Sequence, residues 1–168
     1  MPHVDTPQAV CRFGLSRCDV TPPVGIYHRM WGAATHDRST GIHRPLTATA
    51  FVLEPSSGDA SQRQVFVAVD HCLLWAEEMQ QVRDAILAES DLSPEQVIVV
   101  FSHTHAAGLM GLERTELPGG DLIPPYLTEL GEKLAVVVRE AIADTQPARG
   151  TYGTGHCNLA GHRDTFDP

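Results

Sequence analysis

Two histidines one residue apart follow a strongly apolar stretch of this chain. The run 99–101 predicts a buried strand, and His103 and His105 come just after it. Because side chains alternate along an extended chain, the two imidazoles are expected on the same side. Imidazole is the commonest metal ligand in proteins and transfers protons near neutral pH. The pair therefore predicts a zinc-type centre at the carboxyl edge of a sheet, where ligands bind in open α/β folds.

The same pair has a plainer interpretation, in which two polar residues complete their hydrogen bonds within a surface loop. Ala106, Ala107 and Gly108 follow directly. Their small size leaves room for a substrate or for close backbone approach. An apolar strand followed by small residues favours a functional site over a plain loop.

The elements before this motif are expected to form a strand–helix–strand unit. Strand-forming residues over 46–54 and 64–70, with a turn between them, predict a hairpin. Helical spacing over 77–89 and the apolar run over 96–102 complete the unit. Strands joined by such a crossover are parallel. The second and third strands therefore end at the same edge of the sheet.

One of these strands ends at Asp70-His71-Cys72 and the other at His103-Thr104-His105, so Asp70 and His103 are expected to be neighbours. A carboxylate beside a metal-binding histidine commonly orients the ring and fixes its tautomer, which is one role for Asp70. The other role is to cap the helix that follows. Both interpretations remain open from the sequence.

The remaining segments complete a predicted α/β fold, a mixed sheet with one βαβ parallel pair and flanking helices. They are a loose leader over 1–10, a strand over 11–20, an irregular loop over 26–45, a helix over 125–144 and a strand over 148–155. A loop as long as 26–45 is more often functional than idle.

Composition restricts the classes of partner. The 168 residues carry a formal net charge of −9, which argues against binding nucleic acid or anionic membranes. No apolar run predicts a membrane span. The first residues lack a secretory signal, so the cytoplasm is the default expectation, with secretion possible if a leader was removed.

Four cysteines match neither a zinc-knuckle nor a redox motif, and they are expected as free, mostly buried thiols. They are Cys11, Cys18, Cys72 and Cys157. Cys72 is the exception, because it stands at a strand end beside Asp70 and His71.

Taken in order, several short motifs resemble the N-terminal part of the neutral/alkaline non-lysosomal ceramidase family. They cover nearly the whole chain: Phe13-Gly14-Leu15, Asp19 to Pro23 with Gly25, Met30-Trp31-Gly32, Gly41-Ile42-His43, the strand from Leu46 to Val52, Val67 to Asp70, Ser102-His103-Thr104-His105, Tyr152 to Gly155, and Asn158 to Arg163.

Members of this family are zinc amidases that hydrolyse N-acylsphingosines, so the resemblance implies a small-molecule or lipid-like amide substrate. It implies that His103 binds zinc, that His105 assists substrate binding or proton transfer, and that Arg163 reaches the same pocket. It also places Asp70 and His43 nearby.

The resemblance further implies a second histidine, a glutamate and a tyrosine as zinc ligands from later in a longer chain. Residues 11–168 are accordingly expected to be the N-terminal part of a catalytic domain, truncated at the C-terminus.

Three alternatives accompany this interpretation. A self-contained metalloenzyme would instead recruit His71, His156 or His162. A metallo-β-lactamase-like hydrolase also carries His-x-His after a strand, but its next ligand positions are Ala107 and Gly108 in this chain. A truncated or degenerate domain would instead bind a ligand or partner without catalysis. Oligomeric state is not predicted.

Overall fold

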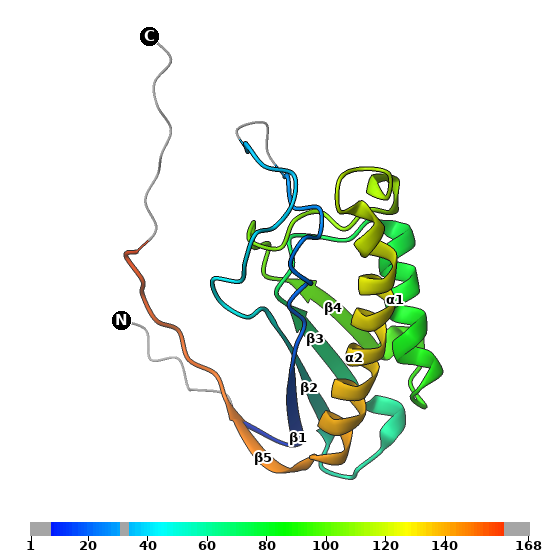
Figure 1. The fold of residues 1–168 in the computed structure, drawn as a ribbon. Coiled ribbons are helices and arrows are strands. Elements are labelled where there is room, and N and C mark those ends of the chain that lie inside the picture. The colour runs from blue at the N-terminus through cyan, green and yellow to red at the C-terminus, as the bar shows by residue number, and fades with distance from the viewer. Residues whose placement is uncertain (1–7, 31–33, 160–168) are drawn as a thin grey trace.

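The structure is a computed structural model that describes residues 8–30 and 34–159. Five strands form one sheet in the order β4-β3-β2-β1-β5 (Figure 1). The elements are β1 (Gln8–Asp19), β2 (Thr47–Pro55), β3 (Gln64–Val69), α1 (Ala76–Ala88), β4 (Val97–Phe101), α2 (Ile123–Ala143) and β5 (Gln146–Thr151), with short 3₁₀ turns at Ala60–Gln62, Pro94–Gln96, Leu112–Arg114 and Gly120–Leu122.

The predicted hairpin and parallel pair are both confirmed. β2 pairs antiparallel with β3, with Val52 opposite Val65. β3 and β4 are parallel, with Val67 opposite Val99, and α1 makes the connection between them. The expected fold class, α/β with a mixed sheet, is therefore correct.

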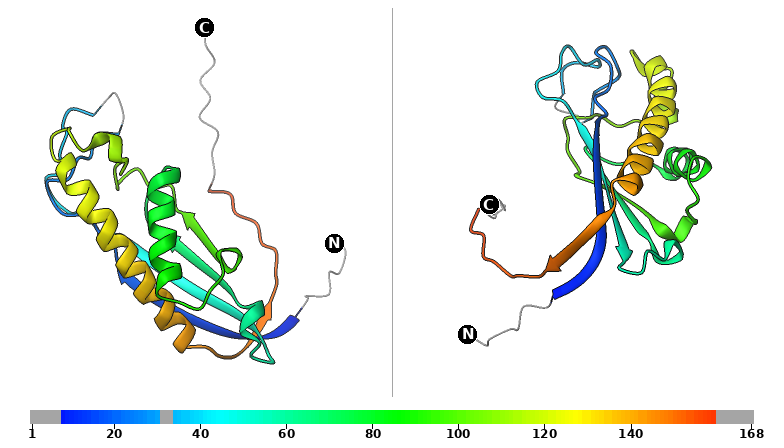
Figure 2. Two further views of the ribbon diagram at one scale, coloured as in Figure 1. Left: turned by 90° about the vertical axis from the view of Figure 1, so that its right-hand side faces the viewer. Right: turned by 90° about the horizontal axis from the view of Figure 1, so that it is seen from below.

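Both helices pack on the same face of the sheet (Figure 2). Alternation along β2 directs Ala48, Ala50 and Val52 into this layer, where they are fully buried. Leu130 and Leu134 of α2 are buried against them in the same core. The apolar period of the sequence thus selects which side of each element lies in the core.

Gly14 allows α2 to approach the sheet closely. A Cβ atom at this position would lie 2.0 Å from the carbonyl oxygen of Ala141, well inside van der Waals contact. Any larger residue would push α2 away from β1.

The opposite face of the sheet carries apolar side chains that no helix of the described residues covers. The Phe51 ring stacks on Phe13 and on Phe66, with centroids 6.2 and 4.7 Å apart. Exposed apolar residues continue this surface on both sides: Leu15, Leu53, Ile98 and Val100.

The two outer boundaries of the sheet differ from expectation. β1 begins at Gln8 and pairs with Thr151 of β5, so residues 8–10 belong to the sheet and not to a loose leader. Residues 1–7 lie outside the described residues. β5 begins at Gln146, two residues earlier than expected, and Pro147 obscured this start. Proline is tolerated there because β5 is an edge strand.

Within the described ranges, neither helix has the length and apolarity needed to cross a lipid bilayer.

Candidate metal centre

The parallel strands β3 and β4 end side by side, which brings two distant segments together. The Ser102 amide donates to the carbonyl oxygen of Val69 at 3.1 Å, so the chain after β4 leaves the sheet beside the end of β3. Cys72 and His103 therefore meet, although 31 residues separate them.

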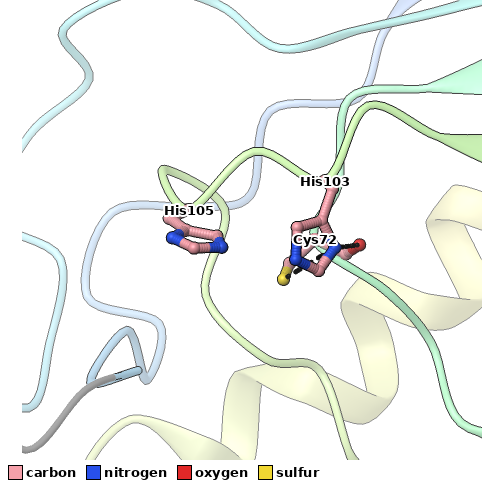
Figure 3. A group of neighbouring side chains, drawn as sticks. All are labelled: Cys72, His103 and His105. Atoms are coloured by element: carbon pink, nitrogen blue, oxygen red, sulfur yellow. Dashed lines mark hydrogen bonds between the residues drawn. The ribbon is translucent and has the colours of Figure 1, made fainter. Parts of the chain in front are cut away.

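Cys72, His103 and His105 form one cluster of possible metal ligands (Figure 3). One donor atom from each residue lies within 4.8 Å of the others. The Cys72 Sγ atom is 3.7 Å from His103 Nδ1, and the two imidazole centroids are 5.1 Å apart. The thiol is buried, whereas both imidazoles are exposed. The cluster is therefore buried at Cys72 and open to solvent at the two histidines.

The backbone of His103 takes a rare conformation to reach this position. Its φ of +55° is the only positive value at a non-glycine residue within 8–30 and 34–159. A left-handed conformation costs a non-glycine residue about 1–3 kcal/mol, and such strain gathers at functional sites. The expected reason for the pairing of the imidazoles was wrong, because β4 ends at Phe101 and a turn, not strand alternation, brings His105 next to His103.

The donor set suits a zinc-type ion. His103 Nδ1–H donates to the Cys72 carbonyl oxygen at 3.1 Å, and this bond assigns the tautomer that leaves the Nε2 lone pair free. Ligand atoms of a tetrahedral zinc ion lie roughly 3.3–3.7 Å apart. The donor atoms of this cluster lie within 4.8 Å of one another, so the side chains would have to draw together to enclose an ion. Burial raises the pKa of the Cys72 thiol, so metal binding must displace a proton.

Asp70 bonds to Thr47, the first residue of β2. One carboxylate oxygen accepts from the amide and from the hydroxyl of Thr47, both at 3.0 Å. Burial raises the pKa of Asp70, but the hydrogen bonds from Thr47, together with Ser102 and the charge of Arg17, outweigh it and hold the pKa below its usual value. Trp75 occupies the N-cap position of α1, so Asp70 does not cap that helix. The bond that orients His103 comes from Cys72.

His71 is fully buried beneath the strand end. Its Nε2–H donates to the Tyr126 hydroxyl, which donates in turn to the Val20 carbonyl oxygen at 2.6 Å. Burial lowers the pKa of His71 to about 4, and Asp70 partly opposes this. Its Nδ1 atom is buried without a hydrogen bond to the described residues. This neutral ring belongs to the core, separate from the exposed cluster.

A cavity of about 630 Å³ borders the cluster through Thr104 and Ala106, the residues on either side of His105. His43, which the resemblance places near the site, is among the residues that line it. His28, which sequence reasoning did not select, also lines it and donates from Nε2 to the Ala106 carbonyl oxygen at 2.9 Å.

Of three further candidates, the structure describes only His156, which is not part of the cluster. His156 is exposed in the extended stretch that follows β5. Arg163 and His162 lie outside the described residues, so their expected roles stay predictions. Cys72 was noticed in the sequence only as an unusual thiol. Its meeting with His103 follows from the parallel pairing of β3 and β4.

The architecture is a mixed α/β sheet with a Cys–His–His cluster after the ends of its parallel strands. Two solved structures share this fold. Neutral ceramidase from Pseudomonas aeruginosa superposes with a TM-score of 0.61 at 21% identity, over 86% of this chain and 23% of the ceramidase. A ceramidase in complex with C2 gives 0.58, also at 21% identity, over 85% of this chain and 22% of that one.

These comparisons confirm, at the level of the fold, the ceramidase resemblance found in the sequence. The chain spans less than a quarter of each ceramidase that it matches. No family model matches the sequence, and a search of curated proteins gives no match.

Proposed function

We propose that this protein is a zinc-dependent hydrolase of N-acyl amines. The observation that carries the proposal is the Cys72–His103–His105 cluster at the strand ends of a ceramidase-like fold. A cavity large enough for a small-molecule ligand adjoins the cluster. Donor atoms, fold and cavity together favour metal-assisted hydrolysis.

Cys72, His103 and His105 would hold the ion. Three protein ligands with one open position are typical of catalytic zinc, whereas structural zinc has four. A zinc ion there would supply Lewis-acid activation of water and of the scissile carbonyl. The Cys72 carbonyl fixes the His103 ring, and the buried thiol anchors the base of the site.

The surrounding residues supply binding and orientation. Thr104 and Ala106 line the cavity on either side of His105, so a ligand that fills the cavity would reach the neighbourhood of the cluster. The bond from His28 to the Ala106 carbonyl holds this turn against the cavity wall. Within the proposal, Arg163 reaches the same pocket, as the resemblance implies, and would stabilise negative charge on the reacting amide or hold a polar group of the substrate.

The test is release of fatty acid from an N-acylsphingosine by metal-free and zinc-loaded protein. We expect hydrolysis only with zinc and its loss in His103→Ala, whereas the matched control His156→Ala should keep it. A zinc-loaded protein that releases no fatty acid would contradict the proposal and favour a ligand-binding domain without catalysis.

His105 has a separate test, because the resemblance implies substrate binding or proton transfer for this residue and we assign it to the metal. As a ligand, His105→Ala weakens zinc affinity together with turnover. If His105→Ala keeps wild-type zinc affinity and loses turnover, the residue moves protons instead.

A further inference from the structure

The cavity beside the metal centre has an unusual charge for this protein. The chain has 21 acidic and 12 basic residues, yet the residues that line the cavity include Arg44, His28 and His43 and no carboxylate. Because one residue in eight of the chain is acidic, a set of residues as large as this lining would include about one or two carboxylates by chance. Arg44 therefore gives this cavity a positive charge that no carboxylate in the lining offsets, and such a cavity attracts anions.

Arg44 is the strongest anion-binding group in this cavity. It is exposed, and it forms no ion pair with another described residue, whereas Arg12 and Arg63 both pair with Glu54. A guanidinium binds a carboxylate through two parallel hydrogen bonds, which an ammonium or an imidazole cannot match. His43 precedes Arg44 in the chain and lines the same wall.

The rest of the lining is largely apolar. Pro22, Ile26 and Leu46 contribute to the wall, and Ile42 is 54% exposed beside Arg44. Apolar walls with a few converging polar groups are typical of small-molecule sites. This combination fits a ligand with an acyl chain and one negatively charged group.

We infer that the cavity binds N-acyl amino acids, with Arg44 recognising the carboxylate and the apolar walls receiving the acyl chain. That the protein cleaves N-acyl amino acids rests on the proposed amide hydrolysis. That the cavity binds them depends only on the residues that line it. A neutral N-acyl amine lacks the group that Arg44 would select.

Binding is measured by calorimetry on the metal-free protein, so that the result does not depend on the cluster. The probes are N-dodecanoylglycine, the neutral N-dodecanoylethanolamine, and dodecanoate. We expect N-dodecanoylglycine to bind about tenfold more tightly than the neutral amide, as one charge-assisted pair allows. Equal affinity for these two probes would overturn the inference.

Two variants test whether Arg44 causes the preference for N-dodecanoylglycine over the neutral amide. Arg44→Gln should abolish it while leaving the affinity for the neutral amide unchanged, and the matched control Arg83→Gln, on the surface of α1, should keep it. A preference that survives in Arg44→Gln would overturn the inference. So would dodecanoate binding as tightly as N-dodecanoylglycine, because the cavity would then recognise a fatty acid.

Turnover separates this inference from the proposed function. If the zinc-loaded protein cleaves N-acylsphingosine but not N-dodecanoylglycine, the substrate inference fails and the hydrolase proposal stands. If N-dodecanoylglycine binds through Arg44 and no amide is cleaved, the cavity inference holds and the hydrolase proposal fails.

Discussion

His71 and His103 follow neighbouring parallel strands, yet their surroundings are opposite. His71 is fully buried, with its imidazole bonded to Tyr126 of α2. His103 is exposed, has a left-handed backbone and lies against Cys72. The two residues show that the role of a histidine after a strand depends on whether another element of the fold covers the end of that strand.

The difference arises from the position of the two strands. β3 lies inside the sheet, and Tyr126 of α2 covers the segment that follows it. β4 is an edge strand, and the chain beyond Phe101 turns towards solvent. We therefore expect substitutions at the buried histidine to change stability, and substitutions at the exposed one to change metal binding.

The largest effect is expected for His71→Ala. It leaves a cavity in the core and removes the hydrogen-bond partner of Tyr126, which together should cost about 2–4 kcal/mol of unfolding free energy. The matched substitution His103→Ala should change stability by less than about 1 kcal/mol. Urea unfolding of both metal-free variants measures the two changes in unfolding free energy. Equal losses of unfolding free energy would show that the two histidines contribute equally to stability.

Tyr126→Phe should have a smaller effect of the same kind. It removes one hydroxyl and leaves both His71 Nε2 and the Val20 carbonyl without their partner. We expect a loss of about 1–3 kcal/mol by urea unfolding, with zinc affinity unchanged. A fall in zinc affinity would indicate that the buried network and the cluster act as one unit.

His103→Gly should have the smallest effect on folding, and in the opposite direction. Glycine adopts a positive φ without strain, and this gain exceeds its entropy cost by about 0.5–1 kcal/mol, so the metal-free protein should become more stable. The control His105→Gly has no such strain to relieve and should lose stability. A less stable His103→Gly protein would argue against strain at this residue.

The fold was predictable as far as local periodicity reaches. Alternation in β2 and the apolar stripe of α2 identified their buried sides, and the crossover length identified β3 and β4 as a parallel pair. The start of β1 was missed, because the pairing of Gln8 with Thr151 depends on the other end of the chain.

The candidate site was predictable only in part. His103 and His105 are visible as a motif, and the cavity that His43 lines has no counterpart among the sequence patterns. The place of Cys72 in the cluster depends on contact across 31 residues, and the burial of His71 depends on where α2 packs. Neither has a local signal in the sequence.

The most direct test of the account is a cobalt(II) titration of the metal-free protein, followed by absorption spectroscopy. Cobalt(II) replaces zinc in such sites, and a thiolate ligand adds a charge-transfer band in the near ultraviolet. We predict saturation at one equivalent with that band present, loss of the band in Cys72→Ser and not in Cys157→Ser, and weaker binding in His103→Ala. A spectrum that is the same in wild-type, Cys72→Ser and His103→Ala proteins would contradict a metal centre at this cluster.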